Sequence, residues 1–287
     1  MRRAARLLWA AGERFFRHNG PDRAAAIALY TLLSLLPLLI FLISVGVAVA
    51  GSFEAAYNGT LYLIGGAVVP LDPASRQALR DFVERAVALR WGGLLLLAWT
   101  GRRMFMSLVG ALQAVFEVPS RGFFRGLARG NLLGLGLVLV TGLGLVATLA
   151  LTTVTAAVEG LLRRLPVGGE TALAAFHGLT GIAFDHVVPT LITLSFLFIL
   201  YRVVPRRYVT TRQAAVGALV ATALWELAKA GFAWYVRNLA QYVGLYGALE
   251  AVIVLALWLE LSFSVILFGG AVVALLMDPE ALRRAQA

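Results

Sequence analysis

Long apolar runs alternate with short polar segments along the chain. Each run holds about twenty residues, which is the length of α-helix that crosses the hydrocarbon core of a bilayer. A helix is expected because a segment in lipid must satisfy its backbone hydrogen bonds internally. The runs predict an all-α membrane protein with six transmembrane helices, at residues 24–50, 92–116, 131–157, 181–201, 214–237 and 249–276.

Residues 1–20 are amphipathic rather than uniformly apolar. Leu7, Leu8, Ala11 and Phe15 share one helical face, and the arginines fall mostly elsewhere. A helix of this kind lies along a membrane surface. It is predicted to end at the Asn-Gly-Pro sequence that follows, because glycine and proline interrupt helices.

The connection at residues 51–90 is the one long connection, and it is expected to face outward. Asp72 suits an N-cap and Pro73 suits the first helical turn, so a second interfacial helix is predicted. About 40 residues are too few for an independent outer domain. The chain is therefore interpreted as a single membrane domain at 21–278 with a cytoplasmic tail at 279–287.

The arginines indicate how the spans are oriented. With six spans both termini lie on one side, and that side receives seventeen arginines, against seven on the other. Basic residues collect in cytoplasmic loops. We therefore expect a multi-pass protein of the bacterial plasma (inner) membrane with both termini in the cytoplasm.

Composition agrees with a membrane protein and excludes several other classes. Of the 287 residues, 60% are hydrophobic and 14% are charged, and the mean hydropathy is +0.84. The net charge of +10 is explained by topology and by anionic lipid headgroups, so no nucleic-acid partner is expected. The chain has no cysteine, which excludes disulfides and thiolate chemistry. We expect no cleavable signal peptide, because the first apolar run is longer than a signal sequence requires.

Polar residues recur within the first span at spacings that return to one helical face. Tyr30, Ser34 and Pro37 belong to this stripe, together with Ser44. Pro37 leaves the carbonyl of Leu33 without its helical partner, and in lipid such a carbonyl needs another donor. We expect the stripe to face the protein interior, either as a packing face or as one wall of a cavity.

Charged residues also occur within the fifth and sixth spans. Glu226 and Lys229 are three residues apart near the middle of the fifth span, and they can pair on one helix. Glu250 lies near the outer end of the sixth span and Glu260 near its centre. Charges at such depths are expensive and usually face inward.

Arg102 and Arg103 lie within the second span, and two placements of these arginines are open. They lie at mid-depth if the span begins near residue 92, and at the cytoplasmic interface if it begins earlier. At mid-depth they would form a near-neutral network with Glu226, Lys229 and Glu260. Such a network either fixes helix packing or forms a site for an anionic headgroup or a proton path.

Enzymatic motifs are missing from the sequence. The chain has three histidines and carries no H-E-x-x-H, G-x-S-x-G or P-loop motif. We therefore predict no catalytic residues, no metal site and no cofactor.

Three stretches carry a resemblance to a known family. They are ALYTLLSLLPLLIFL (28–42), YRVVPRRYVTTRQAAVGALVATALWELAKAGFAWYV (201–236) and YGALEAVIVLALWLELSFSVILFGGAVVAL (246–275). Their order and spacing resemble the BrkB/YihY family of bacterial inner-membrane proteins. The resemblance implies six helices, cytoplasmic termini and a role at the cell envelope. Members have carried the label ribonuclease BN, which the missing nuclease motifs do not support.

These observations give a leading hypothesis and two alternatives. The leading one is a transporter or flippase-like protein of envelope biogenesis that acts on an anionic lipid or other amphiphile. The alternatives are a non-transporting scaffold of envelope machinery and, third, a membrane hydrolase or nuclease. The expected partners are membrane lipids and other envelope proteins, and the sequence leaves substrate, energy source and oligomeric state open.

Overall fold

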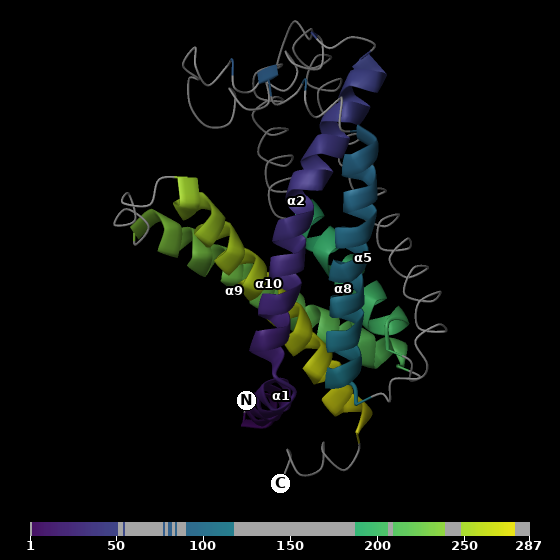
Figure 1. The fold of residues 1–287 in the computed structure, drawn as a ribbon. Helices are drawn as coiled ribbons and strands as arrows, with labels where there is room; N and C mark the ends of the chain where they lie inside the picture. The colour runs from purple at the N-terminus through teal and green to yellow at the C-terminus, as the bar shows by residue number, and fades with distance from the viewer. Residues whose placement is uncertain are drawn as a thin grey trace, which may run out of the picture. The chain divides into compact units, whose positions relative to one another are not determined.

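The computed structural model describes residues 2–50, 54, 77, 80, 81, 84, 90–117, 187–205, 209–238 and 248–278. Most of these residues are helical, and none of them belongs to a β-strand. Six helices are defined there: α1 (Arg2–Arg17), α2 (Gly20–Ala50), α5 (Arg90–Val115), α8 (Val188–Val203), α9 (Thr211–Asn238) and α10 (Ala248–Met277) (Figure 1). These helices confirm the predicted surface helix and five of the predicted spans as helices, with bounds shifted by a few residues.

Several predictions lie outside the described residues. The third span, at 131–157, is one of them, as are residues 181–186 of the fourth span. Of the connection predicted at 51–90, six residues are described: 54, 77, 80, 81, 84 and Arg90, where α5 begins. Each of them is helical, and Gln77 donates a hydrogen bond to Asp81 at 3.0 Å.

Two helices in the described part are long and apolar enough to cross a membrane. They are Thr211–Asn238 and Val252–Met277, and Val188–Val203 is a shorter apolar helix. This result agrees with a helical membrane protein. The number of spans, six, stays a prediction.

The chain divides into two compact units. One comprises residues 1–25 and 108–287, and the other comprises residues 26–107. The first unit therefore holds α1, α8, α9, α10 and the last turns of α5. The second holds most of α2 and the remainder of α5.

Helices α8, α9 and α10 form the centre of the first unit. Gly217 and Gly269 let α9 and α10 approach closely, because a Cβ on Gly269 would lie 2.6 Å from the Cβ of Ala221. The buried Tyr201 of α8 donates a hydrogen bond to the carbonyl of Ile266 at 2.7 Å. Small residues at helix contacts are typical of membrane proteins, where close backbone approach replaces the hydrophobic effect.

The first turn of α9 is closed by a reciprocal cap. The backbone N–H of Gln213 donates to the Thr210 hydroxyl at 3.3 Å, and the Gln213 side chain accepts from the Thr210 N–H at 2.9 Å. This pair is a capping box, which satisfies donors that helix geometry leaves unpaired. The Gln213 amide also donates to the carbonyl of Leu276 at 2.9 Å, so the cap joins the start of α9 to the end of α10.

Helix α1 packs against α10 through its buried residues Ala11 and Phe15. The rings of Phe15 and Phe268 meet edge to face, with centroids 6.2 Å apart. The next helix begins at Gly20, where a Cβ would overlap the ring of Phe15. Between them Asn19 adopts a φ of 52°, a left-handed conformation that asparagine tolerates at helix ends.

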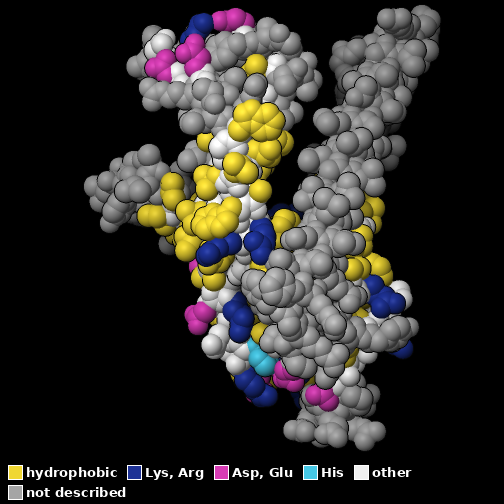
Figure 2. Space-filling view, turned by 45° about the vertical axis from the view of Figure 1, so that its right-hand side comes forward, with side chains coloured by type: hydrophobic (Ala, Val, Ile, Leu, Met, Phe, Trp, Pro, Cys, Tyr) yellow, Lys and Arg dark blue, Asp and Glu magenta, His cyan; other side chains and the backbone are white. Residues whose placement is uncertain are grey.

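A polar cluster fixes the end of α1 to the end of α5. Arg14 donates to the carbonyl of Val115 at 3.0 Å and pairs with Glu117 at 3.2 Å. His18 contacts the other oxygen of Glu117 at 3.0 Å. Figure 2 shows a histidine side chain with acidic and basic side chains around it. We call Arg14, His18 and Glu117 the α1 clamp.

The second unit brings α2 and α5 together. A Cβ on Gly93 would lie 2.7 Å from the side chain of Ile40, so the two helices are in close contact there. Helix α2 continues through Pro37 without interruption. Two hydroxyl groups of α2 bond to the backbone of the same helix. Thr31 and Ser44 each donate a hydrogen bond to the carbonyl four residues earlier, at 2.8 Å.

Candidate functional site

The central feature of the candidate site is an ion pair on α9. Lys229 Nζ lies 2.8 Å from Glu226 Oε2, as the spacing of three residues predicts. The other carboxylate oxygen, Glu226 Oε1, accepts a hydrogen bond from the hydroxyl of Thr190 on α8 at 3.2 Å. The carboxylate therefore joins two helices and holds the ammonium group beside them. We call Thr190, Glu226 and Lys229 the polar triad.

The polar triad lies where the packed part of α9 gives way to an exposed part. Ala218 and Thr222 are buried on the preceding turns, whereas Leu227 is 68% exposed and Trp234 is 59% exposed. The side chains of Lys229 and Glu226 are 39% and 41% exposed. Helix α10 changes in the same way, because residues after Leu261 are mostly buried and those at 252–261 are exposed or half-buried.

Aromatic rings from α9 and α10 pack close to this level. The Trp258 ring lies 5.6 Å from that of Trp225 and 4.9 Å from that of Phe232. Lys229 follows Trp225 by four residues and precedes Phe232 by three, so the three share a side of α9. The ion pair thus lies between a polar contact to α8 and an aromatic contact to α10.

Thr222 lies one turn before Glu226 on the same face of α9. It is 6% exposed, and its hydroxyl has no hydrogen-bond partner within the described residues. Buried polar atoms are almost always paired, so an unpaired one calls for an explanation. A bound water or ligand group next to the polar triad would provide the missing partner.

The polar stripe of the first span lies on the buried side of α2. Ser34 and Pro37 are buried and Tyr30 is half-buried, whereas Leu29 and Leu33 on other faces are 55% and 53% exposed. Ser34 donates to the carbonyl of Thr31 at 2.7 Å. The stripe therefore faces inward as expected, and its part in a site stays a prediction.

Arg102 and Arg103 lie in the middle of α5, and both are exposed. The guanidinium of Arg103 lies 4.8 Å from the centroid of the Trp99 ring, which is a cation–π contact. They belong to the second unit, whereas Glu226, Lys229 and Glu260 belong to the first. The proposed five-charge network therefore stays a prediction.

The two remaining site residues belong to α10. Glu260 lies near its middle and is half-buried. Glu250 lies in its first turn, and its side chain is outside the described part of the structure. Neither is placed in contact with the polar triad by the described residues.

Thr190 was not predicted from the sequence as a site residue. A threonine in an apolar helix gives no signal of its own, and its pairing with Glu226 depends on how α8 and α9 pack. The neighbouring Pro189 did mark a helix start in the sequence, because proline suits the first turn of a helix. The capping box of Thr210 and Gln213 also has a recognisable sequence spacing that was not used.

Together, the apolar helices and the charges within them define a helical membrane protein. A family model, Virulence factor BrkB, matches residues 11–287, and the chain belongs to this family. The resemblance found in the sequence is thereby confirmed.

Relatives of the chain are named as membrane proteins. A UPF0761 membrane protein of Alkalilimnicola ehrlichii is 33% identical over 90% of this chain and 55% of its own length. One of Azotobacter vinelandii is 31% identical over 95% of the chain and 63% of its own, and one of Pseudomonas paraeruginosa is 27% identical over 94% and 62%. The chain thus spans less than two thirds of their length. No solved structure matches it.

Proposed function

We propose that this protein moves or flips an anionic lipid or other amphiphile of the bacterial envelope at the polar triad. The observation that carries the proposal is the half-exposed ion pair of Glu226 and Lys229, bonded across to Thr190. Charged side chains within membrane helices usually face the protein interior or a water-filled cavity. An ion pair that is about two-fifths exposed therefore supports an opening that admits water or a polar headgroup.

The surroundings of the triad suit an amphiphile. The more exposed halves of α9 and α10 offer apolar surface directly beyond the ion pair, including Leu227 and Trp234. Lys229 supplies a cation for an anionic headgroup, and the hydroxyl of Thr222, which has no partner among the described residues, supplies a further polar contact. The ammonium group of Lys229 has three donors, so a headgroup can bind it while Glu226 keeps its bond to Thr190.

A double substitution tests this function. Glu226→Gln with Lys229→Met removes both charges, so neither is left unpaired, and abundance in the membrane should match that of the wild type. Reconstituted proteoliposomes with fluorescent phosphatidylglycerol, assayed by dithionite reduction of the label, should show transport by the wild type. The double variant should lose it. Transport by the double variant at the wild-type rate would contradict the proposal.

A scaffold role is the second candidate, and the bond between Thr190 and Glu226 favours it. That bond joins α8 to α9 and would contribute to packing alone. A purely structural pair predicts that the double variant regains both abundance and activity in a deletion strain. The single variants should each lower abundance, since each removes one charge of the Glu226–Lys229 pair and keeps the other.

A further inference from the structure

Helix α1 carries more apolar surface than α10 covers. Ala11 and Phe15 are buried, whereas Trp9 is 74% exposed, Phe16 67% and Leu8 42%. Ala11 and Phe15 of the predicted apolar face are therefore covered, whereas Leu8 of that face is exposed together with Trp9 and Phe16, which lie outside it. Soluble proteins also expose single hydrophobic residues, but here three large ones lie within nine consecutive residues of one helix.

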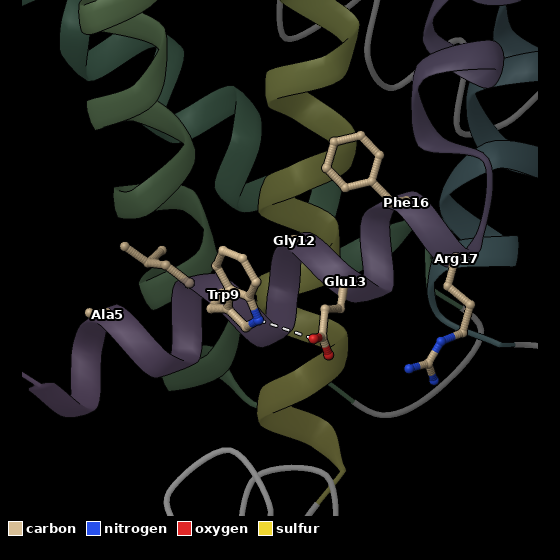
Figure 3. Close-up of a pocket in the computed structure, with 7 residues that line it drawn as sticks. Ala5, Trp9, Gly12, Glu13, Phe16 and Arg17 are labelled. Atoms are coloured by element: carbon tan, nitrogen blue, oxygen red, sulfur yellow. Dashed lines mark hydrogen bonds between the residues drawn. The ribbon is translucent and has the colours of Figure 1, made fainter.

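The exposed residues form a concave surface rather than a ridge. A hollow of about 920 Å³ is lined by Leu8, Trp9, Gly12 and Phe16, with Glu13 and Arg17 at its polar side. Gly12 contributes to the depth of the hollow, because it has no side chain to fill the space between its bulky neighbours. Figure 3 shows Trp9 and Glu13 side by side, joined by a hydrogen bond of 3.0 Å from the indole N–H to the carboxylate.

The charge of α1 is complementary to an anionic ligand. The helix contains five arginines and one glutamate. One of the arginines, Arg14, pairs with Glu117 in the α1 clamp. Glu13 is held by Trp9, while Arg17 is exposed at the edge of the hollow. Tryptophan and phenylalanine next to arginine are typical of helices that lie at the lipid headgroup level.

We infer that the α1 hollow binds one anionic phospholipid, with acyl chain against Leu8, Trp9 and Phe16 and phosphate near Arg17. The site is separate from the polar triad, and it does not depend on whether the triad transports anything. The lipid would hold α1 against the headgroup region while the clamp holds it against α5.

Quenching of Trp9 fluorescence locates the lipid. The full chain is placed in phosphatidylcholine nanodiscs, and the spectrum of Trp9→Phe is subtracted from that of the wild type to isolate Trp9. Brominated phosphatidylglycerol is then titrated against brominated phosphatidylcholine. Trp9 should be quenched at a lower mole fraction of phosphatidylglycerol than of phosphatidylcholine.

Arginine variants test the charge contact. Arg17→Gln should raise the half-quenching mole fraction of phosphatidylglycerol by about fivefold, which is the effect expected for one basic residue at an anionic surface. Arg212→Gln, an exposed arginine at the start of α9, is the matched control and should leave it unchanged. Equal quenching by both lipids, no quenching, or an equal effect of the two variants would overturn the inference. Glu226→Gln with Lys229→Met should retain the quenching, which separates this result from failure of the proposed function.

Discussion

Two partners of the Glu226 carboxylate lie within the described residues, and one of these two could be predicted from the sequence. A spacing of three residues on a helix brings Lys229 within reach whatever the fold, so the 2.8 Å pair could be predicted. The contact to Thr190 requires α8 and α9 to pack in one particular register. Local contacts thus follow from spacing, while contacts between helices depend on packing that a single sequence does not reveal.

Thr190→Val tests the contact between helices. Valine keeps the shape but removes the donor to Glu226, and hydrogen bonds between membrane helices contribute about 0.6–2 kcal/mol. We expect a loss of about 1 kcal/mol in the free energy of unfolding, measured by denaturant titration in detergent. Thr193→Val is the control, because the Thr193 hydroxyl donates to the carbonyl of Pro189 within its own helix. Equal losses in the two variants would argue against a role for the Thr190 bond.

Pro37→Ala tests the buried side of α2. Alanine restores a backbone donor and is about 3 kcal/mol more favourable than proline inside a helix, so abundance in the membrane should not fall. If the polar stripe of α2 forms a wall of the transport path that changes shape, transport in proteoliposomes should fall while abundance is kept. Pro189→Ala is the control, since Pro189 lies in the first turn of α8, where no helical donor is missing. A parallel loss of abundance and transport would support a packing role.

At the scale of elements, apolar runs and breakers predicted the helices well. The runs placed α9 and α10 within a few residues, because helix length in a membrane is set by bilayer thickness. The docking of α1 on α10 was not predicted. Its amphipathic pattern identifies an apolar face but does not say which residues of that face meet Phe268 and which stay exposed.

Gly269→Ala tests the close contact of α9 and α10. The added methyl would lie 2.6 Å from the Cβ of Ala221 and overlap the hydroxyl of Tyr201, so the helices must separate. Overpacking of this kind costs about 1–3 kcal/mol of the free energy of unfolding. In Gly231→Ala the new methyl meets no atom within 4 Å, and the helix propensity of alanine should stabilise α9 by up to about 1 kcal/mol. Heat or denaturant unfolding in detergent measures both, and equal stability of the two variants would rule out a tight contact at Gly269.

At the scale of the whole molecule, membership of the BrkB family is established and the orientation is a prediction. The arginine bias places both termini in the cytoplasm and residue 72 outside. An alkaline phosphatase fusion at Ala287 should be inactive, and an insertion after Asp72 should be active. Matched fusions to a cytoplasm-active reporter provide the control. The opposite pattern would exclude the six-span orientation.

The position of Phe268 has a consequence for biosynthesis. Phe15 leaves the ribosome about 250 residues before its partner, which corresponds to roughly 12–50 s at typical synthesis rates. Glu117 emerges earlier, so the clamp can tether α1 before its apolar face has a protein surface to cover it. During that interval the bilayer surface is the available apolar phase, and α1 would wait there until α10 is inserted. Helix α10, made long after α1, would then complete the docking of α1.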